Sequence, residues 1–430
     1  MRLLVIHQNF PGQFGHLVKE WAARPCWEVR ALASPSAPGL PGFAGLIRYQ
    51  LHRDGHANQH PYLRQMEAAT LHGQAAARAM LALRNSGFVP DAILAHPGWG
   101  ESLYAKDVFP GARLVHLSEW YYDADGADVG FDPEFPITFD DRARIRTWNA
   151  LHALNLTQCD AAVSPTEWQK SRHPEIFQRK LSVQHEGIAL DELGPDPHAT
   201  FSTAEGATLK AGDPVITYVA RNLEPYRGFH VFVRALERIQ RRHSTCHAVI
   251  VGGDGVSYGK RPQDAPHWRE FMLRRVHLDP ARTHFLGRVS RAQYLRVLRV
   301  SAAHAYLTYP FVLSWSMLEA MACGAPLIAS NTAPVREVVE RDLSAARLCD
   351  FFDVDAWATA VLDTLNSPSA ARSSGLRAQA LATRYDRRHA LAGYEALIAP
   401  ATAGVVAART SREGRSAPGA GLQVPMRNVA

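Results

Sequence analysis

Three absences narrow the class of protein that this sequence can encode. No apolar run approaches the roughly 20 residues that a helix needs to cross a bilayer, and the opening apolar run reaches His7 and Gln8 too soon for a signal peptide. The five cysteines are scattered and never spaced Cys-x-x-Cys, which argues against a disulfide framework and against a zinc site. We therefore expect reduced thiols and a cytoplasmic protein.

Motifs for two common ligands are missing as well. The turn at residues 9–15 contains glycines but does not match Gly-x-Gly-x-x-Gly, the spacing that a dinucleotide-binding turn requires. A nicotinamide oxidoreductase is therefore the weakest of the functions that we consider. Nucleic-acid binding is not expected, because no stripe of basic residues alternates with aromatic residues.

The charge of the chain is moderately basic, with a net charge of +6 and a pI of about 9.1. A basic surface attracts phosphate-bearing substrates or the anionic face of a membrane. Residues 401–430 hold four arginines and one glutamate, which is half of the net charge, and they are predicted to be a disordered tail. We interpret most of the charge as an ordinary solvated surface with this tail.

Short β-branched runs alternate with longer helical patterns, which predicts an α/β protein with parallel sheets. The expected strands are residues 2–8, 28–34, 92–96, 113–119, 161–164 and 180–187, then 214–221, 247–252, 283–287, 304–308 and 326–330. The main helical patterns are residues 15–24, 61–84, 142–157, 229–242, 290–301, 314–323, 355–365 and 376–398. Two Rossmann-like domains follow, over residues 1–192 and 213–380, with a linker at 193–212.

The loops that follow the strands are the candidate site, because ligands of open parallel sheets bind beyond the carboxyl ends of the strands. Arg221 and Arg227 stand on either side of a short turn, and both guanidinium groups can converge on one diphosphate. Two exposed surface arginines are the alternative. Gly12, Gly252 and Gly253 permit a close approach of the backbone to a ligand, although Gly12 equally fits a simple turn.

The strongest signal lies at residues 309–326, where a loop leads into a helix whose first amides form an anion site. The amides concerned belong to Val312, Leu313, Ser314, Trp315 and Ser316. Glu319 follows among apolar residues, and a carboxylate in such a helix needs a partner. A ribose diol would supply one, and so would a structural arginine.

Together these segments resemble the retaining family 4 glycosyltransferases, which have the GT-B fold of two Rossmann-like domains facing a central cleft. The resemblance rests on Arg221 and Arg227–Gly228, and on residues 251–253, 285–289 and 319–324. It implies a nucleotide-diphosphate-sugar donor whose diphosphate is neutralised by Arg221 and Arg227 and whose ribose is bound by Glu319. The backbone around Arg288 and Val289 would hold the base, and a helix at residues 381–400 would cross back to the first domain.

Two arginines and a helix N-terminus could stabilise the departing diphosphate without a metal, so we expect no cofactor and no metal, in agreement with the lack of an Asp-x-Asp motif in the expected donor loops. The first domain would then bind the acceptor. Glu119, at the end of a predicted strand, is its catalytic candidate, and His116 within that strand is the alternative. His96, Trp120 and Tyr121 are further acceptor-side candidates. For each histidine, a packed or surface position is the alternative.

One departure from the family pattern concerns Phe311. The family commonly has a second glutamate eight residues before the ribose glutamate, and this sequence has Phe311 there. The donor sugar is therefore left undefined, and two alternative functions remain: a nucleotide-sugar-binding relative without turnover, and a nucleotide-sugar 2-epimerase. Residues 123–139 look like an inserted loop over the acceptor side.

The expected partners are a nucleotide-sugar donor and a glycan, a lipid-linked glycan or a small molecule as acceptor. Peripheral contact with the inner face of the cell membrane is a hypothesis that the basic surface suggests.

Overall fold

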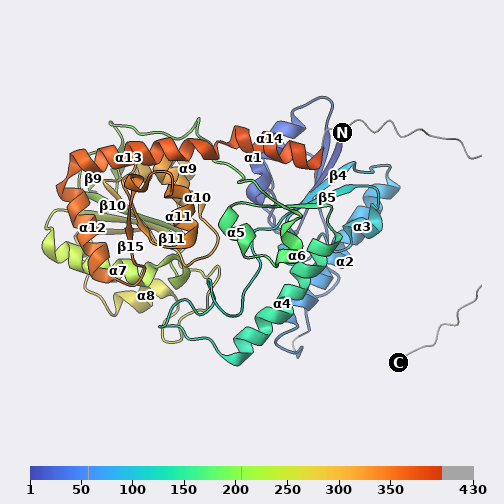
Figure 1. Cartoon of the computed structure of the whole chain (residues 1–430), viewed down its shortest axis with the longest axis horizontal. Helices are drawn as coiled ribbons and strands as arrows, with labels where there is room; N and C mark the ends of the chain where they lie inside the picture. The colour runs from blue at the N-terminus through green and yellow to red at the C-terminus, as the bar shows by residue number, and fades with distance from the viewer. Residues whose placement is uncertain (57, 205, 400–430) are drawn as a thin grey trace, which may run out of the picture. The chain divides into compact units, whose positions relative to one another are not determined.

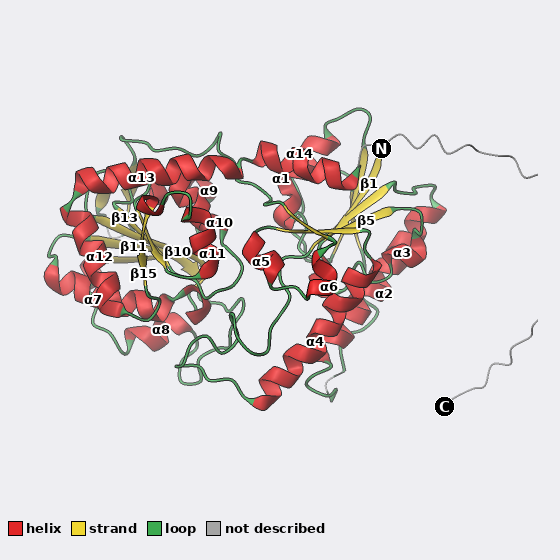
Figure 2. Cartoon of the chain, in the orientation of Figure 1, coloured by secondary structure: helices red, strands yellow, loops and turns green. Residues whose placement is uncertain are grey.

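The computed structural model describes residues 1–399 except residues 57 and 205; the predicted disordered tail at 401–430 lies outside the described residues. The described chain contains two parallel β-sheets, each with helices against its faces (Figures 1 and 2). This is the predicted α/β class with two Rossmann-like domains. None of the helices in this part of the chain is long and apolar enough to cross a bilayer.

The first sheet has seven strands in the order β3-β2-β1-β4-β5-β6-β7, all parallel. They are β1 (Arg2–Ile6), β2 (Glu28–Ala33), β3 (Leu46–Arg48), β4 (Ala92–Ala95), β5 (Arg113–Leu117), β6 (Ala161–Ser164) and β7 (Leu181–Val183). Leu3 to Ile6 are fully buried because helices cover both faces of the sheet. The chain reverses its winding direction between β1 and β4, which is where such sheets bind ligands.

The second sheet has six parallel strands in the order β12-β11-β10-β13-β14-β15. They are β10 (Val215–Asn222), β11 (His247–Gly253), β12 (Thr283–Gly287), β13 (Ala303–Tyr306), β14 (Leu327–Ser330) and β15 (Ala346–Cys349). β3 and β15 were not expected from the sequence, because each is a short edge strand without a strong β-branched run.

The helices of the first domain are α1 (Gly15–Ala22), α2 (Arg64–Asn85), α3 (Ala105–Val108), α4 (Phe139–Gln158), α5 (Glu167–Ser171) and α6 (Glu175–Gln178). Those that follow are α7 (Phe229–Arg242), α8 (Trp268–Leu273), α9 (Arg291–Arg299), α10 (Trp315–Ala322), α11 (Ala333–Val339), α12 (Val354–Asn366), α13 (Pro368–Ala382) and α14 (Arg387–Ile398). α4 begins three residues earlier than expected because Thr138 and Asp141 form a capping box.

The predicted long helix at 376–398 is two helices, because Asp386 caps a new helix by accepting the backbone N–H of Arg388 at 2.8 Å. In α14, Tyr394 and Ile398 pack into the core of the first domain, and Trp21 Nε1 donates to Glu395 at 2.9 Å. The end of the chain's described part therefore belongs to the first domain's core.

The predicted linker at 193–212 contains a β-hairpin of β8 (Thr200–Ser202) and β9 (Thr208–Lys210). Phe201 and Leu209 are buried against apolar side chains of β11 and the end of α9. Single apolar residues between polar neighbours give this segment its alternation, which the surrounding Gly and Ser obscured.

The loop between β5 and α4 is anchored on the second domain. Phe131 packs against Tyr309 with ring centroids 5.1 Å apart. Asp132, which is 2% exposed, accepts a hydrogen bond from Tyr309 Oη at 2.6 Å and lies 2.9 Å from His230 Nε2. The residues expected to cover the acceptor side therefore also tie the two domains together.

We expect Asp132→Ala to lower the free energy of unfolding by about 1–3 kcal/mol, because it leaves the Tyr309 hydroxyl buried without its acceptor. The matched control is Glu134→Gln, which loosens the half-exposed ion pair between Glu134 and Arg234 and should change stability by less than about 1 kcal/mol. Urea denaturation of both variants measures the difference; equal losses would contradict the anchoring role of Asp132.

Candidate active site

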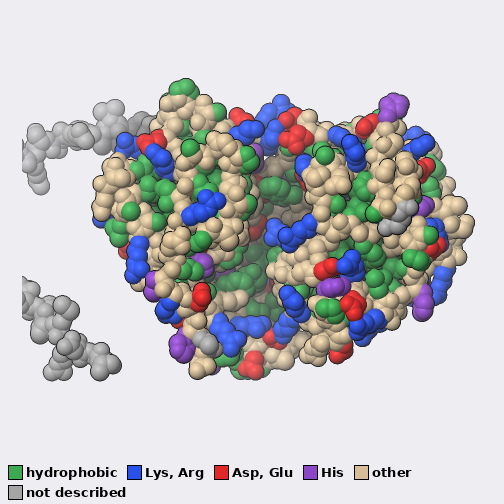
Figure 3. Space-filling view, turned by 180° about the vertical axis from the view of Figure 1, so that it is seen from behind, with side chains coloured by type: hydrophobic (Ala, Val, Ile, Leu, Met, Phe, Trp, Pro, Cys, Tyr) green, Lys and Arg blue, Asp and Glu red, His purple; other side chains and the backbone are tan. Residues whose placement is uncertain are grey.

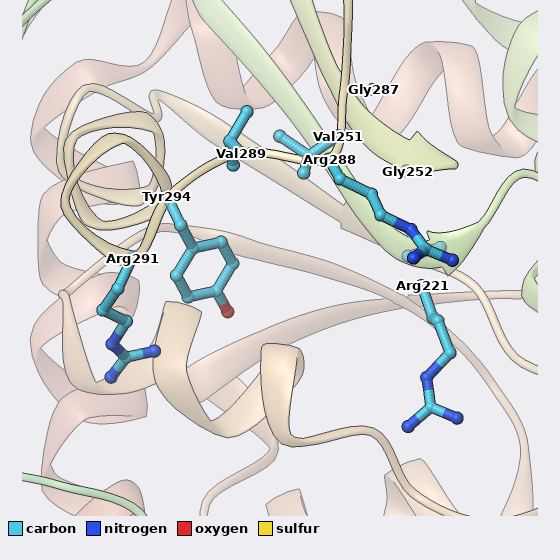
Figure 4. Close-up of a pocket in the computed structure, with 9 residues that line it drawn as sticks. Arg221, Val251, Gly252, Gly287, Arg288, Val289, Arg291 and Tyr294 are labelled. Atoms are coloured by element: carbon cyan, nitrogen blue, oxygen red, sulfur yellow. The ribbon is translucent and has the colours of Figure 1, made fainter. Parts of the chain in front are cut away.

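A hollow of about 350 Å³ opens at the carboxyl ends of β10, β11 and β12 (Figure 4). These strands are neighbours in the second sheet, so their ends meet at one edge. The hollow is lined by Ala220, Arg221, Val251, Gly252, Gly287, Arg288, Val289, Arg291 and Tyr294. The structure thus brings together four predicted donor-site residues, Arg221, Gly252, Arg288 and Val289.

The hollow is strongly basic. Figure 4 shows the side chain of Arg288 reaching toward Arg221, and within the described residues neither is paired with a carboxylate. Gly253 leaves room for this arrangement, because a Cβ there would lie 3.2 Å from Arg288 Nε. Two unpaired guanidinium groups at one edge favour a ligand with several negative charges, such as a diphosphate.

Glu319 lies next to the hollow, because it binds Arg291 and Tyr294, which line the hollow. The residue is 8% exposed, and its carboxylate accepts hydrogen bonds from Arg291 Nη1 and Tyr294 Oη, both at 2.6 Å. The structural arginine considered as an alternative partner is therefore present. Each carboxylate oxygen keeps a second acceptor site, so the expected ribose contact stays a prediction.

Arg227 does not line this hollow. It is buried, and its Nη1 donates to Thr308 Oγ1 at 2.7 Å and to the Val312 carbonyl at 3.0 Å. Gly228 after it adopts φ +65°, and a Cβ there would lie 2.3 Å from the side chain of Leu307. The structure therefore places Arg227 against the loop that leads into α10, and not among the residues that line the basic hollow.

The predicted amide site at the start of α10 is partly occupied by the protein itself. The Ser314 N–H donates to Tyr306 Oη at 2.9 Å, and the Ser314 hydroxyl accepts the Ser316 N–H at 3.4 Å. Leu313 is buried in the core. Phe311 is also buried and packs edge-on against Trp120, with ring centroids 4.9 Å apart.

A second set of polar side chains gathers at the carboxyl edge of the first sheet. Gln13 Nε2 donates to Glu119 Oε1 at 2.9 Å, and His7 Nε2 lies 2.8 Å from Gln13 Oε1. His96 Nε2 lies 3.3 Å from the other oxygen of Glu119. We call His7, Gln13, His96 and Glu119 the Glu119 cluster.

The backbone sets the tautomer of both histidines in the Glu119 cluster. The Asn9 N–H donates to His7 Nδ1 at 3.0 Å, and the Gly98 N–H donates to His96 Nδ1 at 3.2 Å. Each Nε2 then carries the proton and acts as a donor. Gly12 at φ +50° is required beside His7, because a Cβ there would lie 2.2 Å from His7 Nε2.

The charges of the Glu119 cluster follow from these contacts. Burial alone would raise the pKa of Glu119, but its interaction with His96 and the hydrogen bond from Gln13 lower it. Burial, the nearby His96 and the charge of Arg221 lower the pKa of His7 to about 3. Glu119 is therefore an anion, and Arg221 lies near enough for its charge to act on the cluster.

Glu186, just after β7, is a second carboxyl group at this edge and was not predicted. It is 1% exposed, and burial followed by the charge of Glu119 raises its pKa to about 8, while a hydrogen bond from Trp315 of α10 opposes the rise. His7, Gln13 and Glu186 could have been found from their strand-end positions, but the residue types alone did not single them out.

The other acceptor-side candidates occupy different environments. His116 lies inside β5 with no exposed surface. Trp120 is 4% exposed and packs against Trp168 as well as Phe311. Tyr121 lines a separate hollow. Among these residues, only Tyr121 is open to a ligand.

One trio of potential metal ligands occurs among the described residues: Asp132, Glu134 and His230, whose ligand atoms all lie within 4.8 Å of one another. The protein itself engages the two carboxylates, because Tyr309 donates to Asp132 and Arg234 binds Glu134. The trio thus fits the anchoring of the loop before α4.

Both halves of the chain match models of known glycosyltransferase families. Residues 25–193 match the model described as "Glycosyl transferase family 4 group", and residues 213–367 match "Glycosyl transferases group 1". The chain is 28% identical over 236 residues to a GDP-mannose-dependent alpha-(1-6)-phosphatidylinositol monomannoside mannosyltransferase of Mycolicibacterium smegmatis. It is 27% identical over 214 residues to a D-inositol 3-phosphate glycosyltransferase of Rhodococcus jostii. These matches span 50% and 49% of this chain, and 56% and 45% of the two relatives.

Solved structures share the fold at low identity. Sucrose-phosphate synthase from Thermosynechococcus elongatus superposes with a TM-score of 0.69 at 17% identity, over 92% of this chain and 98% of that one. Anabaena HepE in complex with UDP and glucose gives a TM-score of 0.63 at 16% identity, over 92% and 99%. With both of its halves matched and the GT-B fold found, the chain belongs to the family 4 glycosyltransferases.

Proposed function

We propose that the chain transfers a sugar from a nucleotide-diphosphate sugar to an acceptor hydroxyl. The observation that supports this most directly is that a basic hollow lined by Arg221 and Arg288 occurs together with the anionic Glu119 cluster. Burial and the charge of Arg221 both lower the pKa of His7, which belongs to that cluster. The basic hollow is suited to a diphosphate and the Glu119 cluster to a hydroxyl group. The family and the names of its relatives agree with this reaction.

The departing diphosphate gains charge as its bond to the anomeric carbon breaks. Arg221 and Arg288, which no carboxylate of the described residues neutralises, are placed to stabilise that charge by hydrogen bonds. We propose that these arginines do this without a metal, and that Arg227 acts indirectly by holding the loop before α10.

The acceptor oxygen forms the new bond to the anomeric carbon, the electron pair of the broken bond stays on the diphosphate, and the hydroxyl proton passes to a diphosphate oxygen. Attack from the face of the leaving group would retain the anomeric configuration, as the family resemblance implies. Glu119 would orient the acceptor hydroxyl by accepting its hydrogen bond, because its lowered pKa makes it a weak base.

We also propose a glycan, a lipid-linked glycan or a small molecule as the acceptor, because one relative is named for a phosphatidylinositol monomannoside and others for an inositol phosphate. All five cysteines are free, which fits a cytoplasmic location. Figure 3 shows basic and acidic side chains interspersed on one face. Peripheral membrane contact is therefore tested separately, by salt-sensitive sedimentation with anionic vesicles; no binding would remove that part of the proposal.

The decisive experiment offers UDP- and GDP-sugars with labelled sugar to the protein, first by thermal shift and then in a transfer assay with and without EDTA. A donor at 100 times its dissociation constant adds about 2.7 kcal/mol of stability. Transfer or slow hydrolysis that survives EDTA supports the proposal. Donor binding without turnover would favour a binding protein, and an epimerised donor would favour an epimerase. Loss of sugar transfer in EDTA would contradict the metal-free mechanism.

Substitutions in the two clusters should separate binding from turnover. Arg221→Gln should weaken nucleotide-diphosphate binding roughly 10- to 100-fold, because a charged hydrogen bond contributes about 1.5–3 kcal/mol. Glu119→Gln should leave that affinity unchanged and lower kcat by about 100-fold, because the acceptor hydroxyl loses the charged group that orients it. Calorimetric titration with UDP and GDP and steady-state kinetics check both, with the exposed Arg241→Gln on α7 as the control.

Glu186 predicts a specific pH dependence of stability. Its raised pKa means that the unfolded chain ionises near pH 4.5 while the folded protein keeps the proton to about pH 8, so the contribution of Glu186 to stability is lost progressively over that range. Glu186→Gln should therefore be more stable than the wild type above about pH 5, by a margin that grows to a few kcal/mol near pH 8. Melting curves from pH 5 to 9 measure this margin; a margin independent of pH would contradict it.

A further inference from the structure

A second hollow, of about 420 Å³, lies in the first domain and shares no lining residue with the basic hollow. It is formed by the loop after β5, by the middle of α4 and by the chain just after α5. Its lining residues are Tyr121, Tyr122, Asp123, Ala124, Arg146, Asn149, Arg172, His173 and Pro174. We call it the α4 hollow.

The α4 hollow combines aromatic rings with hydrogen-bonding groups. Tyr122 stacks on Trp148 with ring centroids 4.3 Å apart, which makes one wall flat and rigid. Burial raises the pKa of Tyr121 and of Tyr122, so both hydroxyls stay protonated and can donate and accept. A few polar groups on an aromatic wall are the usual composition of a small-molecule site.

The lining of the α4 hollow has an excess of positive charge. It holds two arginines and one aspartate, and burial lowers the pKa of His173 to about 4, so this ring is neutral. Arg172 is held in place by Asp123 at 2.8 Å and by the ring of Trp168. One net positive charge therefore remains for a ligand.

Arg146 is the more exposed of the two cations. Its side chain is 72% exposed, and its Nη2 lies 3.5 Å from Asp125, which also pairs with Arg142. An ion pair this long and this exposed contributes little stability. Arg146 can therefore turn to an acidic group in the hollow at small cost.

The α4 hollow is built on the same frame as Glu119. The Glu119 carbonyl accepts Gln169 Nε2 from α5 at 2.9 Å, and Ser118 Oγ lies 2.9 Å from His173 Nε2. Tyr121 and Tyr122 stand two and three residues after Glu119 in the chain. A ligand in the α4 hollow would therefore contact the same segments of the chain that position Glu119.

We propose that the α4 hollow binds the acceptor, and that this acceptor is a polyhydroxylated ring carrying an acidic group, either phosphate or carboxylate. Arg146 and Arg172 bind the acidic group, while Tyr121, Tyr122 and Asn149 bind ring hydroxyls. This inference rests on the proposed glycosyl transfer, and it adds the chemical class of the second substrate.

The test uses glucose 6-phosphate, mannose 6-phosphate and glucuronate with glucose and mannose as their neutral parents, in calorimetric titrations of the full chain. At least one acidic sugar should bind about tenfold more tightly than its parent. Arg146→Gln, which is exposed and should fold, and Arg146→Gln with Arg172→Gln should remove that difference, while Arg241→Gln should not. Equal binding of acidic and neutral sugars, or a preference that survives the double substitution, would overturn the inference.

Two further measurements separate the possible causes of a failure. UDP and GDP titrations of the same variants report on the basic hollow, so intact nucleotide binding with no acidic-sugar preference rejects the α4 inference alone. Displacement of the acidic sugar by UDP or GDP would assign it to the nucleotide site and reject the inference as well. A third titration adds phosphatidylcholine vesicles with or without phosphatidylinositol. If only the vesicles with phosphatidylinositol compete with the acidic sugar, the acidic ring is a lipid headgroup. If neither kind of vesicle competes, the acceptor is soluble.

Discussion

A carboxylate that is withdrawn from water must be met by hydrogen-bond donors, and this constraint organises the carboxyl edges of both sheets. Glu119 is met by Gln13 and His96, and Glu319 by Arg291 and Tyr294. In each case the partners come from a neighbouring strand end or helix, so satisfying the carboxylate also fixes the side chains around it. The site is therefore a consequence of how two buried charges are compensated.

Glu186 shows the same constraint from the other side, because its pKa is raised while that of Glu119 is lowered. The Trp315 side chain donates a hydrogen bond to it, but burial and the charge of Glu119 outweigh that bond and raise the pKa of Glu186 to about 8. Two carboxyl groups at one edge thus hold different charges because their environments differ. This edge therefore offers both an anionic carboxylate, Glu119, that accepts hydrogen bonds and a protonated carboxyl group, Glu186, that can donate one.

The loop between β5 and α4 connects this edge to the second domain. Trp120 packs on Phe311, and Asp132 is shared by His230 and Tyr309. Phe311 occupies the position where the family commonly has a glutamate, and here it supports an aromatic contact with the first domain. The departure in sequence is accompanied by a buried packing contact, which explains why a hydrophobic residue is stable there.

Much of the fold could be predicted from periodicity, since helix α7 and the central strands are long enough for their apolar pattern to be unambiguous. The edge strands could not, because strands of three or four residues depend on pairing with other segments of the sheet. The hairpin at Phe201 and Leu209 could not, because its short alternation is obscured by the surrounding Gly and Ser. Arg221, Arg288 and Gly252 were brought into one hollow as the strand-end argument expected. Arg227 was not, because the direction of its side chain depends on the carbonyl of Val312.

The sequence by itself determined the family, the two-sheet architecture and the strand ends at which ligands bind, because these depend on local patterns and on conserved geometry of parallel sheets. Only the tertiary structure decided which side chains act together. Gln13 binds Glu119 although the two residues are 106 positions apart in the sequence, and Arg146 and Arg172 from different elements line one hollow. Such contacts arise from packing of separate elements, and packing is decided when the whole chain has folded.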